Sequence, residues 1–271
     1  MKISEITTRD IQAYVTALQQ RGFAPFTIDQ HHQVLSNILR SAVKWYGLPS
    51  NPALGAEMPP MEPKREKWAF GVGEAAQLMN KLPIKPRAMV LLCLTSGIRR
   101  GELFALRWKH LDEQESALSV VEAVYCGHFD KPKTRKSIRV IPLAEQVLGL
   151  LYEWKLKSKK TRPDDLIFGT RNGKPEHSTN ILRRYIYPAC TALGLPRASW
   201  LTFRRTISTW SHHKGVSSKT VAELMGHSTV RTQFIYIQGV EEEKRRAAEL
   251  LAGELARIGQ KSGPTEVKSV N

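Results

Sequence analysis

The chain has 271 residues, of which 41% are hydrophobic, so it can bury a sizeable core and is expected to form one large domain and one small one. Lysine and arginine number 41 against 25 aspartate and glutamate, and the resulting formal charge of +16 indicates a polyanionic partner such as nucleic acid. No apolar run approaches the roughly 18 residues of a membrane span and the first residues do not form a secretory signal, so we expect a cytoplasmic protein with no membrane partner. Three widely spaced cysteines, an odd number, argue against a disulfide framework.

Residues 1–60 carry two helical patterns. Thr7 or Thr8 can cap the first helix, and its apolar residues recur at helical spacing: Ile11, Val15 and Leu18. Thr27 can cap the second helix, which we expect to end at Gly47. Its expected apolar face consists of Val34, Ile38, Ala42 and Val43.

The proline-rich and charged stretch that follows indicates an interdomain linker. Beyond it we expect a mostly helical domain with one β-hairpin, whose strands are 118–125 and 137–141 and whose loop is strongly basic. The expected helices of this domain are 73–82, 85–95, 143–156, 180–193, 203–214, 218–225 and 241–258.

Two segments supply an arginine and an amine in settings that suit phosphate chemistry. In 95–103 (TSGIRRGEL) a glycine turn delivers Arg99 to the start of a helix, and Glu102 is close enough to pair with it. The hairpin loop 131–136 (KPKTRK) supplies a flexible amine. Taken alone, the first feature would be an ordinary surface salt bridge and the second a simple phosphate contact.

Two later segments complete the set. Segment 201–206 (LTFRRT) opens a helix with adjacent arginines, Arg204 and Arg205. In 224–229 (LMGHST), His227 is followed nine residues later by Tyr236. An isolated tyrosine among apolar neighbours would ordinarily be a core residue, so the order and spacing of all four segments carry the argument.

Together these segments resemble the tyrosine recombinases of the phage-integrase type. TSGIRRGEL is similar to the first box of that family, and LMGHST continuing to Tyr236 is similar to its last. Arg204, His227 and Tyr236 stand 23 and 9 residues apart, which agrees with the family's spacing, and the resemblance spans residues 6–236.

The resemblance implies a mainly α fold with a small antiparallel β-hairpin or sheet (α+β), in two domains. Residues 1–60 would form a helical, SAM-like core-binding domain that clamps DNA and is shorter at its front than in other members. Residues 61–68 would be the linker, 69–258 the catalytic domain and 259–271 a polar tail.

The resemblance also implies a site-specific DNA recombinase or integrase, a tyrosine-type DNA strand transferase that uses neither metal nor ATP. The family's roles transfer to five matching positions: Arg99 and Arg204 as phosphate clamps, Lys133 as general acid, His227 as supporting donor and Tyr236 as nucleophile. Lys131 and Lys136 are alternatives to Lys133, while Glu102 and Arg205 would support the site. The implied partners are double-stranded DNA, further copies of the chain in a homotetramer on that DNA, and accessory DNA-bending proteins.

This chemistry needs these residue types. As phosphorus becomes pentacoordinate, negative charge gathers on its non-bridging oxygens. A guanidinium stabilises this charge with two hydrogen bonds and a permanent positive charge, so two arginines can take much of the role that a metal ion has in other enzymes. Neighbouring positive charge also helps a tyrosine hydroxyl, with an ordinary pKa of about 10, to lose its proton. A lysine can protonate the leaving 5′ oxygen, and the phosphotyrosine conserves the energy of the broken bond.

One position departs clearly from the family pattern. Leu201 stands three residues before Arg204, where the family usually has a histidine, and leucine cannot donate a hydrogen bond. Losing one preorganised donor costs on the order of 10² to 10³ in rate, and we expect activity to survive that loss. The alternatives are a catalytically impaired DNA-binding protein of the recombinase fold and a type IB topoisomerase. The apolar stripe of helix 241–258 argues against the topoisomerase, because recombinases commonly use such a helix to dock on a neighbouring subunit. The alternative is that this helix folds back on its own domain.

Overall fold

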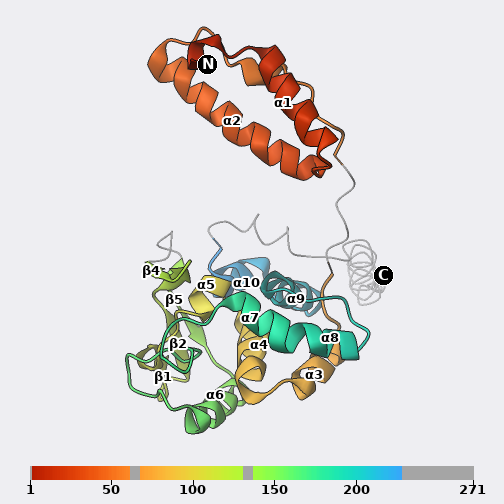
Figure 1. The fold of residues 1–271 in the computed structure, drawn as a ribbon. Coiled ribbons are helices and arrows are strands. Elements are labelled where there is room, and N and C mark those ends of the chain that lie inside the picture. Colours follow the sequence, from red (N-terminus) through yellow and green to blue (C-terminus); the bar gives the residue numbers. More distant parts are fainter. Residues whose placement is uncertain (1, 62–67, 131–136, 228–271) are drawn as a thin grey trace, which may run out of the picture. The chain divides into compact units, whose positions relative to one another are not determined.

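The computed structural model describes residues 2–61, 68–130 and 137–227. The chain divides into two compact units, Met1–Glu66 and Lys67–Asn271, and each has its own hydrophobic core (Figure 1). In the described ranges, no helix combines the length and the apolar character that a bilayer crossing requires.

The first unit is built on α1 (Thr8–Gln20) and α2 (Pro25–Tyr46), with the 3-10 turns η1 (Ile3–Glu5) and η2 (Pro52–Gly55). The Oγ1 of Thr7 caps α1 by accepting a hydrogen bond from the backbone N of Asp10 at 3.3 Å. The buried residues of α1 are the predicted ones: Ile11, Val15 and Leu18. Gly47 ends α2 in the left-handed conformation, with φ of +69°.

One prediction for α2 is wrong and another is only partly right. The helix begins at Pro25, because proline at the first helical position is preorganised for the helix, and so Thr27 lies inside it. The predicted apolar face is half right: Ala42 is buried and Val43 packs against the core, but Val34 and Ile38 are 61% and 52% exposed. The buried residues of α2 are Ile28, Ser36, Leu39 and Ala42. A long helix can carry two apolar stripes, and α1 and η2 cover only one of them within the described part of this unit.

The second unit is mostly helical and contains small antiparallel sheets, as the sequence predicts. Its helical elements are α3 (Val72–Lys81), α4 (Ile84–Ser96), α5 (Arg100–Leu103), η3 (Trp108–His110), α6 (Glu145–Lys157), α7 (Ser178–Ile181), the π-turn η5 (Leu182–Ile186), α8 (Tyr187–Ala192), α9 (Trp200–His213) and α10 (Ser218–Met225). Expected helix 241–258 lies outside the described residues.

The strands form two sheets rather than one hairpin. In the three-stranded sheet, β2 (Ala117–Val120) lies between β1 (Leu111–Asp112) and β5 (Arg139–Pro142), and Leu118 pairs with Ile141. A separate ribbon pairs β3 (Ala123–Tyr125) with β4 (His128–Asp130). The prediction of one strand over 118–125 is therefore wrong, because β5 spans only the first half of that segment and the second half turns back on β4.

Helix α4 lies at the centre of the second unit. Both α6 and α9 pack against it, and its buried residues lie on every side, as expected of a helix that is apolar all round (Figure 1). The end of α4 leads to Arg99, and α9 carries Arg204. The packing of α9 on α4 therefore brings together two arginines that are far apart in the sequence.

Candidate functional site

Arg99 lies at a sharp turn between two helices. Helix α4 ends at Gly97, whose φ of +60° reverses the chain, and the buried Ile98 anchors the turn. Arg99 is the N-cap residue of α5, and its backbone N donates to Glu102 Oε2 at 3.0 Å. Its Nη1 donates to Glu102 Oε1 at 2.8 Å, and its side chain remains 37% exposed. Glu102 thus orients a guanidinium that solvent can still reach.

The carboxylate of Glu102 is itself buried, and its side chain is only 3% exposed. Burial by itself would raise the pKa of this carboxyl group, but the charge of Arg139 and the hydrogen bonds from Arg139 and Arg99 more than offset that effect. The pKa of Glu102 therefore lies below its ordinary value, and the group is ionised near neutral pH.

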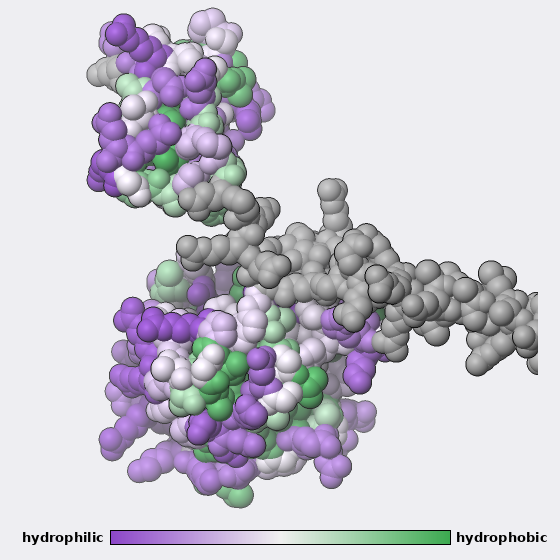
Figure 2. All heavy atoms as spheres, turned by 90° about the vertical axis from the view of Figure 1, so that its right-hand side faces the viewer, coloured by the Kyte–Doolittle hydropathy of each residue, from purple (hydrophilic) through white to green (hydrophobic). Residues whose placement is uncertain are grey.

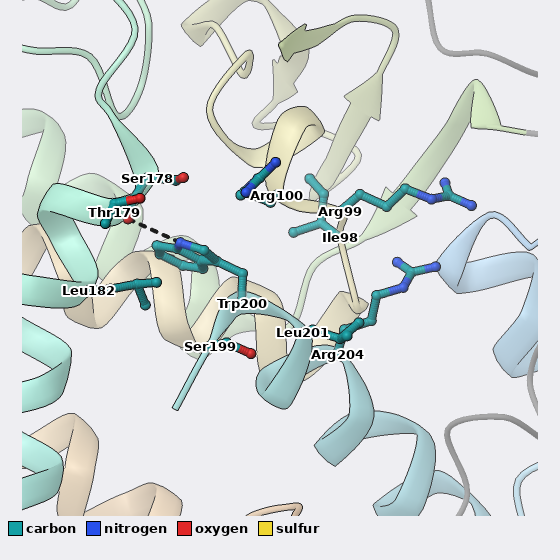
Figure 3. Close-up of a pocket in the computed structure, with 10 residues that line it drawn as sticks. All are labelled: Ile98, Arg99, Arg100, Ser178, Thr179, Leu182, Ser199, Trp200, Leu201 and Arg204. Carbon is teal, nitrogen blue, oxygen red and sulfur yellow. Dashed lines mark hydrogen bonds between the residues drawn. The ribbon is translucent and has the colours of Figure 1, made fainter. Parts of the chain in front are cut away.

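Arg204 projects from α9 and is 5% exposed. Its Nη1 donates to the carbonyl of Gly97, the residue that turns the chain toward Arg99. Its Nη2 donates to the carbonyl of Met225 at 2.8 Å. Arg204 therefore ties α9 both to the turn that carries Arg99 and to the end of α10. Figure 3 shows the side chains of Arg99 and Arg204 extending in the same direction.

The carboxyl end of α10 is joined to three guanidiniums. Each carbonyl of residues 224–226 accepts a hydrogen bond from a different arginine: Leu224 from Arg139 (2.8 Å), Met225 from Arg204 (2.8 Å) and Gly226 from Arg99. The last carbonyls of a helix lack partners within the helix and carry its partial negative charge, so cations are favoured there. The next residue along the chain is His227, which is buried and whose backbone N donates to the carbonyl of Ala222 at 2.8 Å.

Gly226 is required at this junction for two reasons. It ends α10 with φ of +67°, which residues with a side chain rarely adopt. A Cβ at this position would also lie 2.9 Å from Arg139 Nη1 and 3.1 Å from Arg99 Nη1. The close approach of the two guanidiniums therefore depends on the absence of a side chain here.

Arg139 was not among the residues singled out from the sequence. Its side chain is 8% exposed and donates from Nη2 to Glu102 Oε2 at 2.9 Å. A sequence signal exists, because alternate residues of a strand share a face and Ile141, two residues on, is 1% exposed. An arginine at an inward position of a strand indicates a buried anionic or carbonyl partner.

A pocket of about 400 Å³ lies beside the two predicted arginines (Figure 3). Its lining residues are Ile98, Arg99, Arg100, Ser178, Thr179, Leu182, Ser199, Trp200, Leu201 and Arg204. The indole Nε1 of Trp200 donates to the carbonyl of Ser178 at 3.2 Å and so joins α9 to α7 across the pocket. Leu201, at the position where a histidine is expected, is 47% exposed and lines the same pocket.

The other predicted site residues lie away from the junction at the end of α10 or fall outside the described residues. Arg205 is half-buried, and its Nη1 donates to the carbonyl of Trp68 at 3.0 Å, so it holds the start of the second unit against α9. Lys131, Lys133 and Lys136, like Tyr236, lie outside the described residues. Ser137, which follows the lysine-bearing loop, accepts a hydrogen bond on Oγ from Arg99 Nη1 at 3.4 Å. Within the described ranges, no group of three His, Cys, Asp or Glu side chains is placed to hold a metal ion.

Comparison with known proteins identifies one family. The family model described as the phage integrase family matches residues 72–243. A tyrosine recombinase XerC-like protein of Caldanaerobacter subterraneus subsp. tengcongensis is 28% identical, over 93% of this chain and 72% of that protein. The ICEBs1 integrase of Bacillus subtilis is 24% identical, over 85% of this chain and 66% of that protein.

Solved structures share the fold at low sequence identity. The Tn1549 transposon integrase in complex with transposon right end DNA aligns with a TM-score of 0.78 at 19% identity, covering 93% of this chain and 87% of that one. A lambda integrase tetramer bound to a Holliday junction aligns with a TM-score of 0.65 at 19% identity, covering 87% of this chain and 66% of that one.

Proposed function

The chain belongs to the phage integrase family, and on that premise we propose that it is a site-specific DNA recombinase, a tyrosine-type strand transferase that cuts and rejoins duplex DNA. The observation that carries the proposal is the junction at the end of α10. There Arg99 and Arg204, from separate helical segments, bind adjacent carbonyls directly before His227. A scissile phosphate beside this junction would meet both guanidiniums and the histidine.

The two arginines would bind the non-bridging oxygens of the scissile phosphate. Each guanidinium has five N–H donors, so Arg99 can keep its bonds to Glu102 and Gly226 and still offer donors to a phosphate. The exposed part of Arg99 supports this role, as does the first turn of α9, whose helix dipole places partial positive charge at the pocket. His227 would supply one further hydrogen bond to the phosphate.

Cleavage would follow as an in-line displacement at phosphorus. The phenolic oxygen of Tyr236, after losing its proton, forms a bond to phosphorus while the bond from phosphorus to the 5′ oxygen breaks. The leaving 5′ oxygen takes a proton from the ammonium of Lys133, with Lys131 and Lys136 as alternatives. The products are a 3′-phosphotyrosine and a free 5′-hydroxyl.

Rejoining reverses these steps with a different strand. A 5′-hydroxyl from the partner duplex gives its proton to the amine of the same lysine and attacks phosphorus, and the bond to Tyr236 breaks. Bond energy is conserved in the phosphotyrosine throughout, so the exchange needs no ATP. The charge of the two arginines serves both directions, because both pass through the same pentacoordinate phosphorus.

Strand exchange between two duplexes requires four active sites, so we propose a homotetramer on DNA. The lambda integrase structure with a Holliday junction is a tetramer, which supports this assembly for a chain of the same fold. Residues 241–258, with their apolar stripe, would dock on a neighbouring copy, and accessory DNA-bending proteins are a further class of partner. Sizing should give a monomer without DNA and four copies with it; a monomer on saturating site DNA would contradict the assembly.

Covalent trapping tests the proposed function directly. The chain's DNA site is first selected from a pool of random duplexes with the Tyr236→Phe variant, and a duplex bearing that site is then nicked beside the cleavage point. The short 5′-hydroxyl fragment diffuses away, so the unchanged protein should accumulate a covalent adduct with the DNA. Tyr236→Phe should bind the duplex and form no adduct. Absence of an adduct from the unchanged protein would overturn the proposal.

Leu201 favours a second candidate, a DNA-binding protein of this fold with impaired catalysis. Its side chain is 47% exposed in the pocket beside Arg99 and Arg204, where it offers no hydrogen bond. The Leu201→His variant separates the two candidates. An adduct from Leu201→His under conditions where the unchanged protein gives none would establish the impaired form. A relaxing activity on supercoiled DNA by the monomer would instead indicate a type IB topoisomerase.

A further inference from the structure

Arg139 connects the residues around Arg99 more extensively than the proposed mechanism requires. All three nitrogens of its guanidinium donate: Nη2 to Glu102 Oε2 (2.9 Å), Nε to the carbonyl of Leu224 (2.8 Å) and Nη1 to the carbonyl of Ser137 (3.0 Å). Glu102 belongs to α5 and Leu224 to the end of α10, whereas Ser137 lies two residues before Arg139 on the same stretch of chain. Arg139 therefore joins its own strand to two segments that contact Arg99, namely α5 and the end of α10.

Arg139 and Arg99 share one carboxylate. Glu102 Oε2 accepts from Arg139 Nη2 and from the backbone N of Arg99, while Glu102 Oε1 accepts from Arg99 Nη1. A buried carboxylate with a single partner would lose part of its preference for the ionised form. Arg139 supplies the leading favourable charge on Glu102, so its removal should raise the pKa of that group.

The same guanidinium also adds to the charge of the site. Arg99, Arg139 and Glu102 together carry a net charge of +1, which adds to the charge of Arg204, whereas Arg99 and Glu102 alone would carry none. Because Glu102 can then hold Arg99 without cancelling its charge, the phosphate meets an oriented and still positive group. Arg139 does not need to touch the phosphate to have this effect.

We propose that Arg139 is a positioning residue for strand cleavage: its ion pair with Glu102 holds that carboxylate in the place that orients Arg99. The inference rests on the proposed function, because it concerns the rate of that reaction. It predicts that Arg139 acts on the chemical step through Glu102, while DNA binding is little affected.

A double-mutant cycle on Arg139 and Glu102 tests this route. The proteins are the unchanged chain, Arg139→Met, Glu102→Gln and the double variant, each assayed for adduct formation on the nicked duplex at saturating DNA. Arg139→Met should slow adduct formation by about 10²-fold, with the affinity for DNA within about threefold. In the Glu102→Gln background the same change should slow it by no more than about 10-fold, because its effect through Glu102 is gone and only its own charge and its hydrogen bonds to main-chain carbonyls remain.

Two further readouts separate positioning from a general loss of structure. Among the described residues, the charged groups that face Glu102 are Arg99 on its own element and Arg139 on β5. The acid limb of the rate profile should therefore move to higher pH in Arg139→Met, and Arg139→Lys should restore part of the rate because it keeps the charge. Thermal unfolding of each variant measures how much of the effect is structural.

Arg87 offers a matched control. Its Nε donates to the carbonyls of Met79 and Leu82 at 2.9 and 3.1 Å, so it too holds the end of a helix, but no carboxylate of the described residues forms an ion pair with it. Arg87→Met should lower the unfolding temperature and leave the adduct rate of the folded protein unchanged. Equal adduct rates in the unchanged chain and Arg139→Met would overturn this inference alone, as would independent effects in the cycle. No adduct from the unchanged chain would overturn the proposed function as well.

Discussion

Two glycines with nearly identical backbone conformations show how closely the arginines approach the end of α10. Gly226 has φ of +67° and Gly194 has φ of +66°. A Cβ at Gly194 would meet nothing within 4 Å, whereas a Cβ at Gly226 would lie 2.9 Å from Arg139 Nη1. An alanine would therefore suffer similar backbone strain at both positions, but only at Gly226 would it also displace guanidiniums.

Alanine substitutions at these two glycines should consequently differ in activity. Each should lower the free energy of unfolding by about 1–2 kcal/mol, because alanine disfavours a positive φ. Gly226→Ala should in addition slow adduct formation by more than about 10-fold, since Arg99 and Arg139 must move. Denaturant unfolding and the nicked-duplex assay measure the two effects. If both variants formed adduct at the same rate, the packing of the guanidiniums against Gly226 would be irrelevant to the reaction.

The lowered pKa of Glu102 predicts a dependence of stability on pH. A carboxyl group whose pKa is lower in the folded state than in the unfolded state, where it is about 4.3, stabilises the fold fully above the unfolded value. That contribution is lost as the pH falls through the lower, folded value. The free energy of unfolding of the unchanged chain should therefore fall more steeply below about pH 4.3 than that of Glu102→Gln. Parallel curves for the two proteins would show that Glu102 has the same pKa in both states.

At the scale of elements, the sequence predicts helices well and strand boundaries less well. The helix predicted over 218–225 coincides with α10, and the buried stripe of α1 is the predicted one. The segment 118–125 is rich in residues that favour strands, yet it contributes to two sheets, because Cys126 and Gly127 adopt positive φ and turn β3 back on β4. Composition identifies strand character but does not say which partner strand pairs with which half.

The candidate site was only partly predictable, because some of its contacts depend on which elements pack together. Arg99, Glu102, Arg204 and His227 follow from short segments of sequence and lie at one junction, while their catalytic roles stay predictions. Arg139 was missed although it shares a strand face with the apolar Ile141, and the carbonyls at the end of α10 were missed because main-chain acceptors leave no mark in a sequence. Their use depends on how α4, α9 and α10 pack together.

Helix α2 provides a test of which apolar stripe stabilises the first unit. Leu39 is fully buried, while the adjacent Ile38 is 52% exposed. Figure 2 shows that the surface of this unit carries hydrophobic residues among hydrophilic ones. Leu39→Ala should destabilise the unit by about 2–5 kcal/mol and Ile38→Ala by less than about 1 kcal/mol. Hydrogen exchange of the α1 amides reports the unfolding of this unit. Comparable losses of protection in the two variants would mean that a further segment covers the stripe containing Ile38.

For the whole molecule, the positive charge is distributed very unequally between the two units. Residues 1–66 contain seven Lys and Arg and six Asp and Glu. Residues 67–271 therefore contain 34 Lys and Arg and 19 Asp and Glu. Nearly all of the formal charge of +16 therefore belongs to the unit that carries the candidate site. Because binding to a polyanion releases counterions in proportion to the phosphates neutralised, this unit should set the salt dependence of DNA binding.

Salt titrations of the whole chain and of a fragment comprising residues 68–271 can measure that contribution. If the protein neutralises about 6–10 phosphates, the affinity of the whole chain for duplex DNA should fall by about 10³–10⁵-fold between 50 and 200 mM salt. The fragment should bind more weakly at every salt concentration, since it has lost contact area, yet its plot of log affinity against log salt should have nearly the same slope. Fluorescence anisotropy of a labelled duplex measures both lines. A slope reduced by half in the fragment would mean that residues 1–66, despite their near-zero net charge, present their few basic side chains to the DNA backbone.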